Sequence, residues 1–134
     1  MKSRESIIRL KRFQVDDKRR QVAQIEAMIA DFDRRVKELD DQILAEQERV
    51  GITDVAHFAY PTFAKAAMQR RDNLKASADE LNGQLERAQD KLAEAVEELK
   101  KIELMEERDQ EREREAADEA ELDEIAGRNH AFGS

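Results

Sequence analysis

The sequence contains no cysteine and no tryptophan, and it has only one proline and four glycines among its 134 residues. Without cysteine, the chain can form neither a disulfide framework nor a thiolate metal site or nucleophile. With so little proline and glycine, few positions could serve the tight turns of a β-sheet or a barrel. Aromatic residues make up 4% of the chain, so its composition is not that of a compact globule.

Long apolar runs are missing as well. The longest uninterrupted run, Ala27 to Ala30, is far shorter than the roughly 20 residues that a membrane-spanning helix needs. Near the N-terminus, Ile7 and Ile8 are flanked by charged residues, so there is no apolar core of a signal peptide. We therefore expect a soluble cytoplasmic protein without direct membrane insertion.

The chain does contain a strong heptad pattern, which is typical of a coiled coil. Charged residues make up 42% of the sequence, a content at which disorder is the competing interpretation. The sustained pattern argues against disorder up to about residue 105. One β-branched residue recurs at every seventh position: Ile8, Val15, Val22, Ile29, Val36, Ile43 and Val50, with Ile25, Phe32 and Leu39 between them.

A second apolar pattern follows a single break in the chain, from Gly51 to Pro61. Glycine can cap a helix and proline can begin one, so this segment predicts a loop between two helices. The two patterns match if the chain folds back on itself, with the numbers of facing residues summing to about 113. We therefore predict an all-α fold with an intramolecular antiparallel coiled-coil hairpin, monomeric on its own. Its second seam comprises Leu74, Ala78, Leu81, Leu85, Ala88, Leu92, Ala95, Leu99 and Ile102.

The predicted hairpin domain covers residues 1–105, with helices at about 3–50 and 62–105 and a loop at about 51–61. Residues 106–134 form an acidic extension with 11 acidic and 4 basic residues, a net charge of −7. They form helices readily but carry no apolar stripe, so we expect a helical or frayed tail that is disordered at its end. The first 20 residues are basic in contrast, with eight lysines and arginines against three carboxylates.

The sequence gives little support for catalysis. The two histidines, His57 and His130, are far apart in the chain, and no pair of residues has the spacing of metal ligands. There is no glycine-rich phosphate loop, and carboxylates on a helical hairpin lie in solvent, where their pKa values stay ordinary. We expect a non-enzymatic protein without cofactor or metal. Because acidic residues interleave with the basic ones, nucleic acid is not an expected partner either.

Two regions carry more apolar and basic residues than the coiled coil needs. Around the first turns, Lys11 and Lys18 occupy positions where an apolar residue is usual. The surplus can be a ragged coiled-coil end with snorkelling lysines or a docking surface. Around the loop, aromatic residues can cap the hairpin by packing over Ile52, Val55 and Leu74, or they can form a binding patch. The candidate partner-binding residues are Ile7, Arg9, Leu10, Arg12, Phe13 and Lys18 in the first region, and Phe58, Tyr60, Phe63, Arg70 and Arg71 in the second.

The run from Lys2 to Glu26 and the segment HFAYPTFAKAAMQRRDNL from His57 to Leu74 resemble the FliJ family of the flagellar type III export apparatus, in its alphaproteobacterial form. The resemblance covers about Met1 to Met105. It implies a small antiparallel coiled coil, similar to the stalk subunit of rotary ATPases. It also implies three partners: the ring-shaped export ATPase, the cytoplasmic domain of the membrane protein of the export gate, and export chaperones.

Carried over to this sequence, the resemblance implies an ATPase contact near the N-terminus and a gate contact near the loop. The expected location is the cytoplasmic side of the inner-membrane basal body. Two other interpretations stay open: a Gre-type coiled-coil transcription factor, which would need an acidic tip, and a homodimeric coiled-coil scaffold. The implied ATPase contact is formed by Ile7, Arg9, Leu10, Arg12 and Phe13, and the implied gate contact by Phe58, Tyr60, Arg70 and Arg71.

Overall fold

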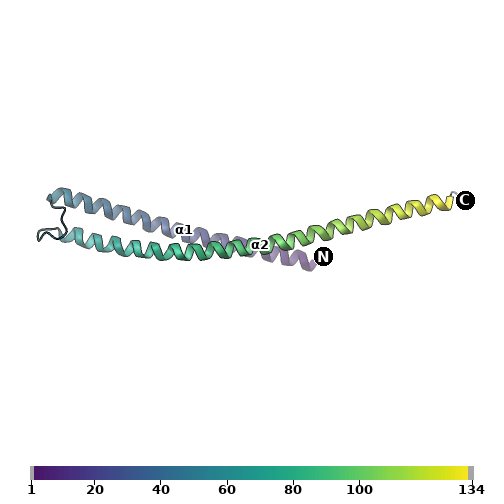
Figure 1. The fold of residues 1–134 in the computed structure, drawn as a ribbon, viewed down its shortest axis with the longest axis horizontal. Helices are drawn as coiled ribbons and strands as arrows, with labels where there is room; N and C mark the ends of the chain where they lie inside the picture. The colour runs from purple at the N-terminus through teal and green to yellow at the C-terminus, as the bar shows by residue number, and fades with distance from the viewer. Residues whose placement is uncertain (1, 133–134) are drawn as a thin grey trace. The chain divides into compact units, whose positions relative to one another are not determined.

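Two long helices, α1 (Lys2–Val50) and α2 (Thr62–Phe132), make up almost all of the chain (Figure 1). The computed structural model describes the backbone of residues 2–132 and the side chains of residues 3–129, and no strand occurs among them. The helices pack against each other in opposite directions, which confirms the predicted all-α hairpin. Helix α1 contains neither glycine nor proline, and Glu5 in its first turn and Arg49 in its last turn both complement the helix dipole.

The turn between the helices is built from short backbone hydrogen bonds. Gly51 has a φ of 78° and donates its N–H to the carbonyl of Gln47 at 2.8 Å, the left-handed cap that the sequence predicted. The Asp54 carboxylate accepts a bond from the N–H of Ala56 at 2.9 Å. The carbonyl of Pro61 then accepts the N–H of Lys65 at 3.1 Å, so the residue before α2 provides the first carbonyl of that helix.

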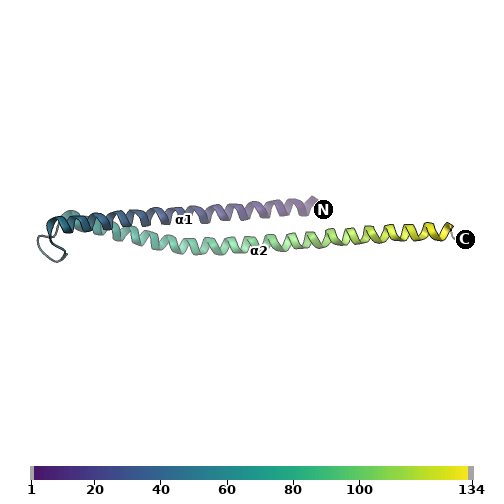
Figure 2. The same ribbon diagram turned by 90° about the horizontal axis from the view of Figure 1, so that it is seen from above.

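Helix α2 continues past residue 105, where the predicted hairpin domain ended, into the predicted tail. The apolar seam fades near residue 105, and the helix runs on to Phe132, so the tail takes the helical form of the two that were expected. Figure 2 shows α2 extending past the first turn of α1. Every side chain from Gln110 to Asn129 is exposed. Part of the predicted terminal disorder falls on Gly133 and Ser134, which lie outside the described residues.

The contacts divide the chain into two compact units, although both helices are continuous across the division. One unit comprises Asp16–Ala93. Its core is the expected seam, with one addition: α2 joins the seam from Ala64 onward, earlier than the leucine pattern suggested. The small side chains of Ala64 and Ala67 are buried, which indicates a close approach of the helices near the loop. The buried apolar residues of this unit are Val22, Ile43, Tyr60, Ala64, Ala67, Ala78, Leu81 and Ala88.

The other unit comprises Met1–Val15 and Glu94–Ser134. Its buried apolar residues, among those described, are Ile8 and Val15 of α1. On α2, Leu99 and Ile102 are half-buried. At the next seam positions, Arg4 of α1 forms an ion pair with Asp109, and a second with Glu106 at 3.5 Å. Charged residues therefore continue the seam where apolar residues end.

Ion pairs between the helices report their register. Lys11 meets Glu98 at 2.9 Å, Arg12 meets Glu103 at 3.1 Å, and Arg71 meets Asp40 at 3.0 Å. The numbers of these partners sum to between 109 and 115, which agrees with the predicted value of about 113. Since the seam of α1 faces α2 of the same chain, a homodimeric zipper is not needed to bury it.

The close approach at Ala64 leads to a stability prediction. Ala64 has no exposed surface, so replacing it with leucine forces extra methyl groups between the helices. We expect Ala64→Leu to lower the free energy of unfolding by about 1–3 kcal/mol, measured by urea denaturation followed by circular dichroism. Ala66→Leu is the matched control, because Ala66 is exposed on the same helix. Equal losses in the two variants would contradict the close approach.

Candidate functional site

An exposed apolar stripe runs along the first turns of α1. Ile7, Leu10 and Phe13 are spaced three residues apart, so consecutive members are neighbours on the helix surface. Their exposed fractions are 43%, 53% and 63%. In the same unit, Leu104 and Met105 of α2 are also about half exposed. This N-terminal apolar stripe lies outside the seam, which uses Ile8 and Val15.

Basic residues accompany the stripe on a different face of α1. Arg9 is exposed, and Arg12 pairs with Glu103 of α2 while more than half of its side chain stays exposed. Both arginines line a shallow groove of about 420 Å³ between the two helices, with Glu5, Ile8, Glu106 and Gln110. Lys18 belongs to the other unit and is half-buried at its seam position, as expected for a snorkelling side chain.

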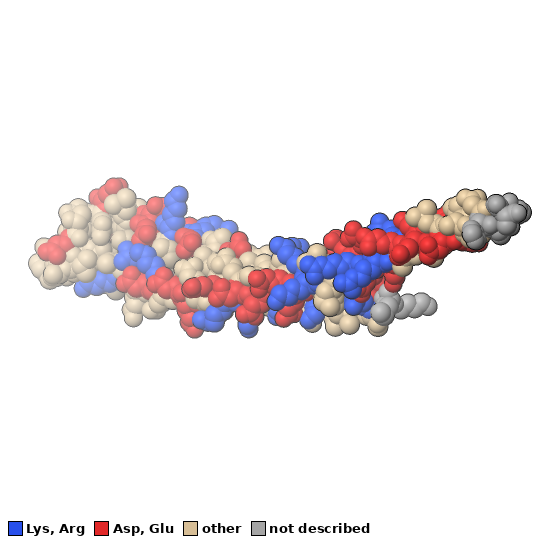
Figure 3. Space-filling model, turned by 45° about the vertical axis from the view of Figure 1, so that its right-hand side comes forward, with Lys and Arg blue, Asp and Glu red and all other residues tan. Residues whose placement is uncertain are grey.

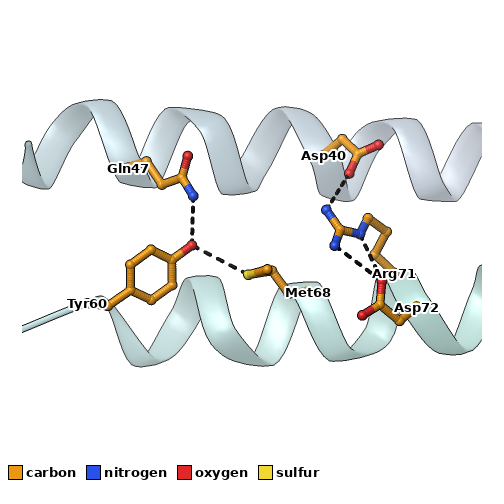
Figure 4. A network of polar contacts seen from close by, with 6 residues as sticks. All are labelled: Asp40, Gln47, Tyr60, Met68, Arg71 and Asp72. Carbon is orange, nitrogen blue, oxygen red and sulfur yellow. Dashed lines mark hydrogen bonds and ion pairs between the residues drawn. The ribbon is translucent and has the colours of Figure 1, made fainter. Parts of the chain in front are cut away.

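Near the loop, Tyr60 differs from the exposed aromatic residue that a binding patch would need. Only 4% of it is exposed. Its hydroxyl accepts a hydrogen bond from the Gln47 amide at 2.8 Å and donates one to the Met68 sulfur at 3.5 Å (Figure 4). Tyr60 therefore links the last turn of α1, through Gln47, to the first turns of α2, through Met68.

Arg71 is also engaged within the chain. It occupies a seam position, where its guanidinium donates hydrogen bonds to Asp40 of α1 at 3.0 Å and to Asp72 at 3.2 Å (Figure 4). The bond with Asp40 is the main cause of a raised pKa for Arg71, against the opposing effect of burial. Its neighbour Arg70 is exposed. Of the two arginines, only Arg70 presents its side chain to solvent.

The exposed part of the loop region is a small apolar tip. Phe58 is 95% exposed, and Val55 and Phe63 are about half exposed. The ring of His57 stacks on Phe58 with 4.7 Å between ring centroids, and its Nδ1 accepts the N–H of Ala59 at 3.0 Å. These contacts give the tip a defined conformation. We call Val55, Phe58 and Phe63 the loop tip.

The described residues offer exposed apolar and basic surfaces that suit binding. In the part of the chain that the structure describes, no group of three or more potential ligands could hold a metal ion. The other pKa shifts arise in surface ion pairs: the Lys11 ammonium lowers the pKa of Glu98, and the pairing of Glu46 with Arg49 lowers that of Glu46 and raises that of Arg49. None of the described helices is long and apolar enough to cross a membrane.

Sequence reasoning missed two features. The first is Arg4 as a seam residue. Arg4, Lys11 and Lys18 are seven residues apart, so all three occupy the same heptad position. The pairing of Arg4 with Glu106 and Asp109 shows that the seam extends beyond Met105. The other feature is a shallow apolar groove of about 200 Å³, lined by Met28, Phe32, Ser77, Glu80, Leu81 and Gln84.

Acidic side chains gather along the C-terminal part of α2, as Figure 3 shows. Arg112 pairs with Asp109 and Arg128 with Glu124 along the helix itself. Leu122 and Ile125 are exposed there, by 65% and 45%. Their spacing of three residues and their exposed fractions are similar to those of Ile7 and Leu10. Substitutions at these two positions can therefore serve as controls for substitutions in the N-terminal apolar stripe.

Comparison with protein families gives one match. The family described as flagellar FliJ protein matches residues 1–132 of the chain. No curated protein and no solved structure matches it.

The ion pair between Lys11 and Glu98 leads to a pH prediction. The pKa of Glu98 lies below its ordinary value of 4.5, first because Lys11 donates a hydrogen bond to it. A carboxylate with a lowered pKa stabilises the fold above the unfolded pKa, and this contribution is lost as pH falls through the folded value. We expect Lys11→Gln to raise the pKa of Glu98 toward 4.5, measured by carboxyl NMR titration.

Arg34→Gln is the control for this titration, because Arg34 pairs with Asp31 on the same helix and has no contact with Glu98. It should leave the pKa of Glu98 unchanged. An unchanged pKa in Lys11→Gln would show that Lys11 is not the cause of the shift.

Proposed function

Since the chain belongs to the flagellar FliJ protein family and is therefore a component of flagellar protein export, we propose that it is a non-enzymatic coupling protein between the export ATPase ring and the export gate. In this proposal it acts as a coiled-coil stalk on the cytoplasmic side of the basal body. The observation that supports the proposal most is that both units carry apolar side chains that their own seams leave exposed.

The N-terminal apolar stripe is the proposed contact with the ATPase ring. Ile7 and Leu10 share the first turns of α1 with Arg9 and Arg12, and arginine is one of the residue types enriched at interfaces. Both arginines keep much of their surface exposed. A partner could therefore bind the stripe and the guanidinium groups while the hairpin stays closed.

The loop tip is the proposed contact with the cytoplasmic domain of the gate protein. Phe58 projects almost fully into solvent, where an isolated soluble protein gains nothing from it. Phe63 and Arg70 add a second aromatic ring and a cation on the first turns of α2. Tyr60 and Arg71 are left out of this surface, because the hairpin itself uses their side chains.

Escort of export chaperones is part of the proposal on the strength of the family resemblance, and no surface of the chain is assigned to it. A Gre-type transcription factor has weaker support, because such a factor needs an acidic tip. The only carboxylate in the loop belongs to Asp54, and it accepts a hydrogen bond from the N–H of Ala56 within its own turn.

We expect the double variant Ile7→Ser, Leu10→Ser to weaken binding to the cognate export ATPase by about 2 kcal/mol or more, roughly thirtyfold. Surface plasmon resonance gives the affinity, and a hydrolysis assay gives the effect on ATP turnover. The matched control is Leu122→Ser, Ile125→Ser, which removes two exposed apolar side chains with the same spacing. Wild-type protein that neither binds the ATPase nor changes its rate would refute the proposed ring contact.

Phe58→Ser should weaken binding to the cytoplasmic domain of the gate protein by a similar factor, because it removes the most exposed aromatic ring. Binding to the ATPase should remain unchanged in this variant. Leu44→Ser is the control, since Leu44 is exposed in the same unit but lies outside the loop. If Leu44→Ser and Phe58→Ser behave alike, the loop tip is not the gate contact.

A further inference from the structure

We propose that the first four turns of α1, up to Val15, form an electrostatic latch that releases α2 while the helices of Asp16–Ala93 stay paired. The latch is a conformational device of the unit that contains both Arg4 and Glu106, and it is independent of the partners proposed above. Its closed state is the structure described here. Its open state lacks the ion pairs between the two helices of this unit.

The residues of the seam indicate that the helices of the latch unit can separate while those of Asp16–Ala93 stay paired. In Asp16–Ala93, eight apolar residues are buried: seven on the two helices and Tyr60 in the loop. In the latch unit, the buried apolar residues among those described are Ile8 and Val15. Arg4 and Lys11 take successive alternate seam positions, where an apolar residue would normally pack. The longer unit also has charged residues at seam positions, Lys18 and Arg71. On α2, five residues of Asp16–Ala93 are buried, whereas none of its described residues in the latch unit is. Apolar burial by α2 is therefore smaller in the latch unit.

Ion pairs link the two helices in the latch. Arg4 pairs with Glu106 and Asp109, and its side chain is 22% exposed. Lys11 pairs with Glu98. All of these groups remain in contact with solvent, so salt screens their attraction. At 1 M salt the screening length falls to about 3 Å, the distance between the paired atoms themselves.

The two helices of the latch also carry opposite charge at the seam, which makes the device sensitive to charged partners. The cations lie on α1 and the carboxylates on α2. A strongly charged surface can compete for one helix and release the other. Opening would also uncover Ile8 and Val15, which are buried in the closed state.

Spin labels can test the latch in the full chain, because the absence of cysteine allows labelling at introduced positions only. Ser3→Cys, Glu107→Cys reports on the latch unit. Gln24→Cys, Glu86→Cys reports on the other unit from equivalent heptad positions. All four residues are exposed. Double electron–electron resonance then gives a distance distribution for each pair.

We expect both pairs to give one narrow distribution at low salt. At 1 M NaCl the Ser3 and Glu107 pair should gain a broad component at longer distances, while the Gln24 and Glu86 pair stays unchanged. The charge variant Arg4→Gln, Lys11→Gln should produce the same broad component at low salt. The matched variant Arg34→Gln, Arg49→Gln should not, because those arginines pair within α1 itself.

Two results would overturn the latch. One is an unchanged latch-pair distribution in both high salt and the Arg4→Gln, Lys11→Gln variant. The other is simultaneous broadening of both pairs, which would mean that the hairpin opens as a whole. Binding to the ATPase or the gate protein is not part of this measurement, so the proposed function and the latch can fail separately.

Discussion

The register between α1 and α2 is the constraint on which the rest of the structure depends. Gly51 ends α1 in a left-handed conformation and Pro61 supplies the first carbonyl of α2, so the length of the loop is fixed from both sides. Once the loop length is set, each seam residue has one facing position. Tyr60 fixes the register at the loop end of the hairpin, because its bonds to Gln47 and Met68 join both helices next to the loop.

Much of the fold could be predicted from the sequence because its determinants are local and periodic. The apolar residue at every seventh position from Ile8 to Val50 specifies the buried face of a helix. Gly51 and Pro61 specify one break between two helices. The start of the second seam could not be predicted in this way. Ala64 and Ala67 are small enough to be read as neutral positions, and Arg71 looks like a surface residue until Asp40 is placed opposite it.

The candidate surfaces were predictable only in outline. Composition identifies a surplus of apolar and basic residues near Ile7 and near Phe58, but it cannot decide which of them the hairpin uses. Tyr60 and Phe58 are two residues apart in the chain, but Tyr60 is 4% exposed and Phe58 is 95% exposed. The Tyr60 hydroxyl is bonded to Gln47 and Met68, whereas the Phe58 ring stacks on the exposed His57.

The C-terminal part of α2 shows that the end of a seam and the end of a helix are separate events. A seam ends where apolar residues stop facing a partner, whereas a helix ends where the backbone meets a breaking residue. Residues 106–126 contain no glycine and no proline, and pairs such as Arg128 with Glu124 stabilise the helix along its own surface. Gly127 alone disfavours the helix by about 1 kcal/mol relative to alanine. A single glycine does not end the helix, and α2 therefore extends beyond the part that faces α1.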